Sequence, residues 1–235
     1  MNLLLVKPTD YIADNRVRID GRRLQHVLKV HRASVGESLK VGLLDGLIGQ
    51  GTLTQLDADA MELELLLDQQ PPPQLPLTLL LALPRPKMLK RIFQSCATLG
   101  VEKLVLINSY RVEKSYWQTP FLAKDKIREH LILGLEQGMA TQLPQVMLRK
   151  RFKPFVEDEL PQLVGDQRAL VAHPYHAEPC PRHSNQPTVL AIGPEGGFIP
   201  YEVDKLVDCG FTPIEIGRRI LRVETAITAL CSKLF

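Results

Sequence analysis

The sequence is poor in aromatic residues, carries no cysteine motif and contains no long hydrophobic run. Phe, Trp and Tyr make up only 6% of the 235 residues, so the core must be built mainly from aliphatic side chains. None of the 4 cysteines belongs to a C-x-x-C pair, which excludes a zinc ribbon or a thioredoxin-type motif and predicts buried, reduced thiols. No apolar run approaches the roughly 18 residues that cross a bilayer, and the first residues lack the basic region of a signal peptide. We therefore expect a cytoplasmic protein.

A strong overall charge is also missing. The 29 Lys and Arg residues against 26 Asp and Glu give a net charge of +3, which by itself does not indicate a nucleic-acid partner. The hydrophobic fraction of 45% and the charged fraction of 23% are typical of a soluble globular protein. Length and composition thus predict one large domain or two modest ones.

A proline-rich segment, PPPQLP at residues 71–76, divides the chain. Closely spaced prolines interrupt helices and sheets and hold a chain extended, so we expect a stiff linker between residues 1–70 and 77–235. The first part shows short strand patterns separated by turn residues, and one helical pattern at residues 22–30. It is predicted to form a small β-barrel with one short helix, its strands at residues 38–41, 51–56 and 61–67.

Residues 77–235 alternate between strand and helix patterns. The continuous aliphatic run at residues 77–83 is typical of a strand buried on both faces of a parallel sheet. Further strands are predicted at residues 103–107, 169–172, 188–192 and 213–216, and helices at residues 87–99, 124–137, 201–209 and 224–234. The alternation predicts an α/β domain with a mostly parallel sheet.

The chain contains two local clusters of basic residues although its net charge is small. The first contains Arg16, Arg18, Arg22, Arg23, Lys29 and Arg32, and the second contains Arg85, Lys87, Lys90 and Arg91. Such clusters can bind phosphates, although charge alone favours the interpretation that each is a solvated face. The second cluster lies where a strand ends and a helix begins, which is where ligands approach parallel sheets.

A glycine-rich loop at residues 193–197 follows the strand predicted at 188–192. Its sequence, Gly-Pro-Glu-Gly-Gly, permits positive φ angles and a close approach of the backbone to a ligand. It matches neither the Walker A pattern nor G-x-G-x-x-G, so a nucleotide-triphosphate site and a Rossmann dinucleotide site are disfavoured. An ordinary strand-to-helix turn is the alternative interpretation.

A second loop, at residues 216–222, lies between a predicted strand and the last helix. Its apolar Ile220 and Leu221 could enclose a flat ring, and Arg222 could meet an anion or a carboxylate. Glu224 and Thr225 are natural residues for the first turn of a helix, so part of this segment is expected to initiate that helix.

Together, these two loops closely resemble the signature of the RsmE family of SPOUT-type RNA methyltransferases, which form N3-methyluridine in 16S ribosomal RNA. The residues that carry the resemblance are Gly193-Pro194-Glu195-Gly196-Gly197 and Gly217-x-x-Ile220-Leu221-Arg222-x-Glu224-Thr225-Ala226. The segment from Arg22 to Val30 also looks like part of that family's PUA-like RNA-binding barrel.

The resemblance implies a trefoil-knotted α/β domain after a PUA-like barrel, an exception to the usual absence of knots. It implies S-adenosylmethionine as cofactor, ribosomal RNA or the small ribosomal subunit as partner, a homodimer, and no metal. The implied cofactor-binding residues are Val171, Ala172, His173, Gly193, Pro194, Glu195, Gly196, Gly197, Ile216, Gly217, Ile220, Leu221, Arg222 and Thr225.

Catalytic and RNA-binding roles can be assigned to particular residues on the same basis. Arg222 is expected to stabilise a uridine anion and Glu195 to act as a base, with His173 a further titratable candidate or a loop-capping residue. The expected RNA-binding residues are Arg22, Arg23, His26, Lys29, Arg85, Lys87, Lys90 and Arg91.

The sequence departs from the family pattern at a few positions. Arg218 stands where the family usually has proline, Val223 where it often has threonine, and residues 138–144 lack an expected arginine. An altered RNA site would follow if that arginine positions the target. The alternatives are therefore a paralogue that methylates another RNA nucleotide, and a non-catalytic RNA-binding or ribosome-assembly protein.

Overall fold

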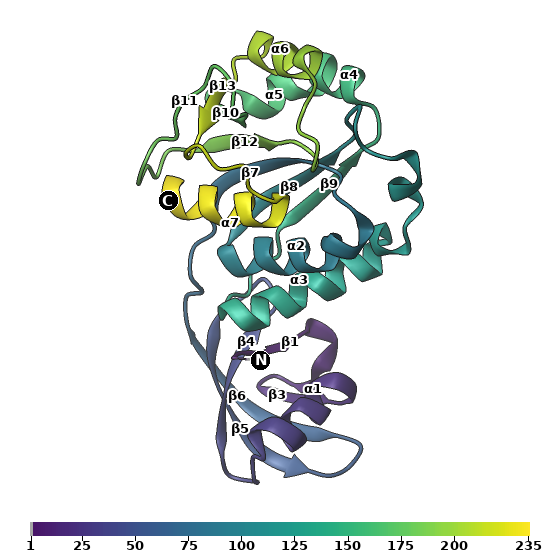
Figure 1. Cartoon of the computed structure of the whole chain (residues 1–235). Helices are drawn as coiled ribbons and strands as arrows, with labels where there is room; N and C mark the ends of the chain where they lie inside the picture. The colour runs from purple at the N-terminus through teal and green to yellow at the C-terminus, as the bar shows by residue number, and fades with distance from the viewer. Residues whose placement is uncertain (1) are drawn as a thin grey trace.

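The computed structural model describes residues 2–235 and contains two β-sheets, one on each side of the proline-rich segment (Figure 1). The first sheet has the strand order β1-β4-β5-β6-β3-β2. Its strands are β1 (Leu4–Val6), β2 (Tyr11–Ala13), β3 (Arg16–Ile19), β4 (Ser38–Leu43), β5 (Ile48–Leu56) and β6 (Met61–Gln69). Strand β1 pairs in parallel with β4, and the other neighbours are antiparallel.

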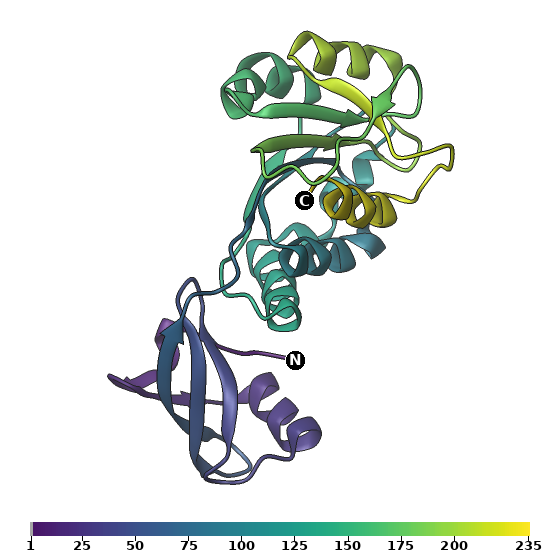
Figure 2. The ribbon, with the colours of Figure 1, turned by 90° about the vertical axis from the view of Figure 1, so that its left-hand side faces the viewer.

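This sheet curls around a small core of its own (Figure 2). In β3 the burial alternates, so that Val17 and Ile19 are buried while Arg16 and Arg18 lie on the exposed face near Glu62. The short helix α1 (Gly21–His26) continues into a π-helical turn, η2 (Val27–His31), which ends at Arg32 with a φ of 52°. The predicted barrel with one helix therefore takes the form of a curled half-barrel.

The second sheet is parallel throughout and has the order β11-β13-β10-β12-β7-β8-β9. Its strands are β7 (Leu75–Ala82), β8 (Val101–Ile107), β9 (Gln145–Arg149), β10 (Arg168–Ala172), β11 (Glu178–Pro179), β12 (Thr188–Ile192) and β13 (Thr212–Glu215). The central strand β12 is fully buried, as its uninterrupted apolar sequence requires.

Helices cover both faces of this sheet (Figure 1). One face carries α2 (Pro86–Leu99), α3 (Lys124–Gly138) and α7 (Val223–Leu234), and the other carries α4 (Phe152–Pro154), α5 (Leu160–Val164) and α6 (Pro200–Asp208). Short 3-10 or π turns are η1 (Pro8–Asp10), η3 (Lys114–Gln118), η4 (Pro120–Leu122) and η5 (Phe155–Glu159). The predicted α/β fold preceded by a β-sheet unit is confirmed, and the knot stays a prediction.

The linker is shorter than the proline pattern predicts. Strand β6 ends at Gln69 and β7 begins at Leu75, so Leu75 and Pro76 belong to the sheet. The Leu75 amide donates to the Gly100 carbonyl at 2.7 Å. The pairing register with β8 shifts between Leu75 and Thr78, which lets the ladder continue past a residue without an N–H group.

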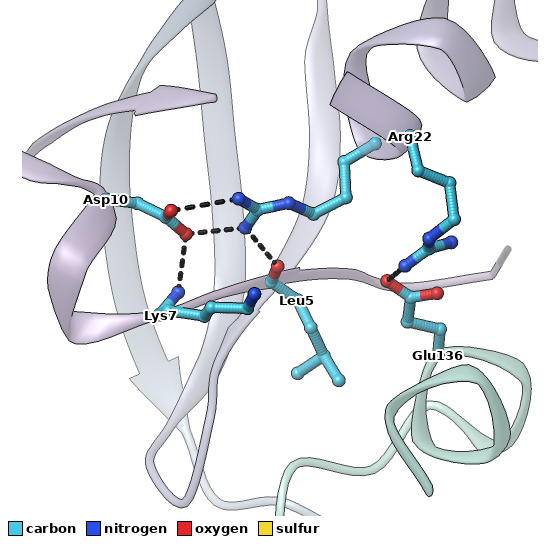
Figure 3. Close-up of polar contacts among 6 residues, drawn as sticks. Leu5, Lys7, Asp10, Arg22 and Glu136 are labelled. Atoms are coloured by element: carbon cyan, nitrogen blue, oxygen red, sulfur yellow. Dashed lines mark hydrogen bonds and ion pairs between the residues drawn. The ribbon is translucent and has the colours of Figure 1, made fainter. Parts of the chain in front are cut away.

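The half-barrel docks on the C-terminal end of α3. The backbone amides of Asn2 and Leu3 donate to the Glu136 carbonyl, and the Arg22 guanidinium donates to the buried Glu136 carboxylate at 2.7 Å (Figure 3). The Thr141 hydroxyl donates to the Gly46 carbonyl at 2.6 Å. The segment that lacks the family's arginine therefore contributes directly to the contact between the two sheets.

Three of the cysteines, Cys96, Cys180 and Cys231, are buried, while Cys209 is half-buried, and all four are free thiols. Burial raises the pKa of Cys231 to about 12. Among residues 2–235, none of the helices combines the length and the apolar composition needed to cross a membrane.

Candidate functional site

A cavity of about 780 Å³ lies at the carboxyl ends of β10, β12 and β13. Each of these neighbouring parallel strands contributes the loop that follows it to the cavity wall. Ligands approach parallel sheets at this edge, and the volume lies within the usual range of roughly 300–1,000 Å³ for small-molecule sites. The position and size thus fit a binding site for an organic molecule.

The loop after β12 turns so tightly that glycine is required. A Cβ atom on Gly193 would lie 2.9 Å from the Phe198 amide nitrogen, and Gly197 has a φ of 74°. The Gly197 amide donates to the Pro194 carbonyl at 2.7 Å, and the buried Phe198 anchors the end of the turn. The three glycines of this loop, Gly193, Gly196 and Gly197, consequently line the cavity with backbone alone.

Two arginines, one from the loop after β7 and one from the loop after β8, contact this loop. The Arg85 amide donates to Glu195 Oε1 at 3.2 Å, and the Arg85 guanidinium lies 3.9 Å from the same oxygen. The Arg111 guanidinium donates to the Gly196 carbonyl. Glu195 is thereby oriented at the lip of the cavity, and Arg111 forms part of the cavity wall.

Buried Glu202 ties the start of α6 to the loop after β8. Its Oε2 accepts hydrogen bonds from the Ile199 amide at 3.1 Å and the Ser109 hydroxyl at 3.0 Å, and its Oε1 accepts the Tyr110 amide at 2.7 Å. Glu202 is only 2% exposed, and its three accepted hydrogen bonds join the start of α6 to the loop after β8.

The loop after β13 is open in comparison. Gly217 has a φ of 132°, and the side chain of Ile220 is exposed at the cavity, with 82% of the residue accessible to solvent. Arg222 has an extended backbone and precedes α7, its carbonyl accepting the Ala226 amide at 2.8 Å. Helix α7 turns Ala226 toward the cavity and leaves Thr225 exposed, because adjacent helical positions point about 100° apart.

The loop after β10 brings His173 to the cavity. The His173 amide donates to the Ile214 carbonyl at 3.1 Å, and its ring meets the Tyr175 ring edge-on at 5.5 Å. Burial is the main cause that lowers the pKa of His173, and the nearby His176 lowers it further. Both effects favour the neutral form of the imidazole.

Most of the residues expected to bind the cofactor meet at this cavity. The lining includes Ala172, His173, Gly193, Pro194, Glu195, Gly196, Gly197, Ile216, Gly217, Ile220 and Leu221. Val171, Arg222 and Thr225 do not line it; Val171 is fully buried in β10. Within residues 2–235, no group of three or more His, Cys, Asp or Glu side chains is placed to hold a metal ion.

A family model described as an RNA methyltransferase domain matches residues 70–235, which contain the whole parallel sheet and its cavity. The chain belongs to this RNA methyltransferase domain family. The resemblance inferred from the two glycine-containing loops is thus confirmed.

Relatives share the organisation of this methyltransferase over nearly its full length. A protein named ribosomal RNA small subunit methyltransferase E from Treponema pallidum is 28% identical over 220 residues, which cover 89% of this chain and 81% of the relative. A protein named ribosomal RNA small subunit methyltransferase E 1 from Borreliella burgdorferi is 24% identical, over 97% of this chain and 95% of the relative. The crystal structure of a ribosomal RNA small subunit methyltransferase E from Neisseria gonorrhoeae has the same fold, with a TM-score of 0.74 at 22% identity over 98% and 96% of the two chains.

The methyltransferase also has a groove of about 650 Å³ between helix α1 of the half-barrel and helices α2, α3 and α7. Arg22 and His26 from α1 and Arg91 from α2 line this groove, together with polar residues of α2, α3 and α7. The groove therefore brings together residues of the two basic clusters, which lie far apart in the sequence. Lys29, Lys87 and Lys90 are exposed, and Lys90 Nζ lies 4.4 Å from the centre of the Phe121 ring.

Arg23, one of the residues expected to bind RNA, is instead engaged within the half-barrel. Its guanidinium binds both oxygens of Asp10, at 2.5 Å and 2.9 Å, and donates to the Leu5 carbonyl at 2.9 Å. Only 11% of the Arg23 side chain is exposed. Burial raises the pKa of Asp10, but the hydrogen bonds from Arg23 and from the Lys7 amide (Figure 3) outweigh it and leave this pKa below its ordinary value. Arg23 therefore stabilises the half-barrel.

Sequence reasoning missed Arg111 and Glu202. The signal for Arg111 was a basic residue soon after a strand that ends at the same sheet edge as the glycine loop. Glu202 could have been found as a carboxylate in the first turn of α6, where it accepts a hydrogen bond from the amide preceding the helix.

Proposed function

We propose that this methyltransferase transfers a methyl group from S-adenosylmethionine to N3 of a uridine in 16S ribosomal RNA. The observation that carries the proposal is the convergence of the loops at residues 193–197 and 216–221 on one cavity. These loops carry the motifs that resemble the RsmE family, and the relatives named above are small-subunit ribosomal RNA methyltransferases.

The cavity fits this cofactor in its chemistry and its size. The backbone of Gly193, Gly196 and Gly197 offers polar groups to a ligand, whereas Ile220 and Leu221 offer an apolar surface for a flat ring. The Neisseria gonorrhoeae relative is bound to S-adenosyl methionine. When bound, this cofactor supplies a methyl group activated by a positively charged sulfur.

The residues of the chain must then place the uridine and accept its N3 proton. We assign the proton acceptor to Glu195, whose carboxylate is held at the cavity lip by the Arg85 amide. His173 in the loop after β10 is the second candidate for this step. Arg222 follows the cavity-lining Leu221 and is assigned to stabilise the negative charge that develops on the uridine.

We assign RNA binding to the groove lined by Arg22, His26 and Arg91, and to exposed basic side chains in η2 and near the start of α2. The residues are Arg22, His26, Lys29, Arg85, Lys87, Lys90 and Arg91. Arg22 also pairs with buried Glu136, so its removal disturbs the docking of the two sheets as well as the charge. Lys29→Ala and Arg91→Ala are the cleaner variants, and each is expected to reduce the salt dependence of RNA binding by about one released ion.

The resemblance further suggests a cytoplasmic homodimer that is built from a two-domain chain. Two large side chains at the rim of the cavity are exposed, Tyr175 at 65% and Ile220 at 82%. Because exposed apolar surface often marks an interface, they support a contact with a second copy of the chain. Sedimentation of the purified chain over a range of concentrations tests the dimer.

The experiment that tests the reaction is mass spectrometry of ribosomal RNA nucleosides from a deletion strain and its parent. We expect N3-methyluridine to disappear from 16S ribosomal RNA and to return with the wild-type gene. Loss of a different methylated nucleoside would instead identify a paralogue with another target. An unchanged set of modifications, together with no binding of S-adenosylmethionine by the purified chain, would favour a non-catalytic RNA-binding role.

A further inference from the structure

The glycine loop after β12 is held by arginines from the next two strands of the sheet. The strand order β12-β7-β8 places the loops after β7 and β8 successively farther from it. Arg85 comes from the first of these loops and binds Glu195, and Arg111 comes from the second and binds Gly196. Consecutive residues of one loop are thus held by two separate elements.

Arg111 makes the closer contact. Its Cδ lies 2.9 Å from the position that a Cβ atom on Gly196 would occupy, and its Nη1 lies 4.0 Å from the same position on Gly197. The side chain consequently lies along the glycine backbone while its guanidinium donates to the Gly196 carbonyl. Arg85, in contrast, reaches Glu195 mainly through its backbone amide.

The loop that carries Arg111 is itself rigidly supported. Ser109 and Tyr110 both donate to buried Glu202, and the Val112 amide donates to the Ser109 carbonyl at 3.0 Å. Glu202 also accepts the Ile199 amide just beyond the glycine loop. Both ends of the Arg111–Gly196 contact are therefore fixed by the same buried carboxylate.

We propose that Arg111 is a positioning residue that holds the backbone of residues 193–197 in the shape that binds the cofactor. This inference rests on the proposed function, because it assigns the cavity to S-adenosylmethionine. Arg111 acts through the Gly196 carbonyl, and a Cβ atom on Gly196 would collide with the Arg111 side chain. A preorganised loop lowers the cost of ordering the site when the ligand binds.

The first test compares Arg111→Ala and Arg111→Lys with the wild type by isothermal titration of S-adenosylmethionine. A charge-assisted hydrogen bond supports an expected loss of affinity of about tenfold for the alanine variant. The lysine variant should recover part of this loss, since an ammonium can still donate to the carbonyl. Arg182→Ala, which removes an exposed arginine that does not line the cavity, is the control and should bind like the wild type.

The second test asks whether Arg111 acts through the loop. Hydrogen exchange of the amides in residues 193–198 should become faster in ligand-free Arg111→Ala, while the melting temperature and RNA affinity stay close to wild type. Gly196→Ala should weaken cofactor binding when Arg111 is present and add little to Arg111→Ala, because the new methyl group then has room.

The outcomes separate the two proposals. If the wild-type chain does not bind S-adenosylmethionine, both the proposed function and this inference are wrong. If the wild type binds it and Arg111→Ala binds equally well, or if the Gly196 and Arg111 effects are additive, only the positioning role is overturned.

Discussion

The two loops that carry the methyltransferase signature are held very differently. The loop at residues 193–197 is contacted by Arg85 and Arg111 and is followed by the three hydrogen bonds of Glu202. No hydrogen bond joins residues 217–221 to another described element, and Ile220 is largely exposed. One wall of the cavity is thus held by neighbouring elements and is called here the preorganised wall, whereas the other, the open wall, has few such contacts.

This contrast has a physical reason in the sheet. Strand β12 is central and has neighbours on both sides whose loops can reach across to it, while β13 lies beside only β10 and the two-residue β11. A loop near the sheet edge has fewer elements from which donors can come. Loops with few ties open at lower free-energy cost, so we expect residues 216–222 to admit and release the cofactor.

The largest expected effect comes from removing the support of the preorganised wall. Glu202→Ala leaves the Ile199 and Tyr110 amides and the Ser109 hydroxyl without their acceptor, which should lower the free energy of unfolding by about 3 kcal/mol. Urea denaturation followed by circular dichroism measures this loss. Glu202→Gln keeps one acceptor oxygen, so its free energy of unfolding should fall by less. An alanine variant as stable as the wild type would contradict the role of Glu202.

A smaller effect is expected at the open wall, and on binding rather than on stability. Ile220→Ala removes an exposed side chain, so the free energy of unfolding should stay within about 0.5 kcal/mol of wild type. The affinity for S-adenosylmethionine should fall about tenfold, because the ligand loses apolar contact area. Leu66→Ala, at a 68% exposed position in the other sheet, is the control and should change neither quantity. Equal cofactor affinity in Ile220→Ala would place the ligand elsewhere.

The smallest expected effect is a pH dependence from the third loop of the cavity. Burial lowers the pKa of folded His173 below its unfolded value, with His176 adding to the effect, so the unfolded chain binds more protons near pH 6. The contribution of His173 to the free energy of unfolding should therefore rise as the pH increases through its pKa in the folded chain and then through its pKa in the unfolded chain. His173→Asn should flatten the plot of unfolding free energy against pH between pH 5.5 and 7.5. An unchanged slope would show that His173 does not contribute.

Much of the fold follows from patterns within short stretches of sequence. The aliphatic run in β7 and the helical spacing of α2 predict their elements because burial on one or two faces imposes a fixed period. Pro76 was misassigned to the linker because the register shift that accommodates it depends on pairing with β8. Arg23 was assigned to RNA because its partner Asp10 is recognisable only after η1 and α1 have packed together.

By itself, the sequence determined the alternation of strands and helices, the two glycine-containing loops and the family to which they belong. These features are local, since glycine conformations and hydrophobic periods depend on neighbouring residues. Only the tertiary structure decided that Arg85 and Arg111 bind successive residues of one loop, that Glu202 supports both sides of that contact, and that Arg22 and Arg91 share a groove. Such contacts depend on the order of strands in the sheet and on the docking of its helices, which join residues that are far apart along the chain.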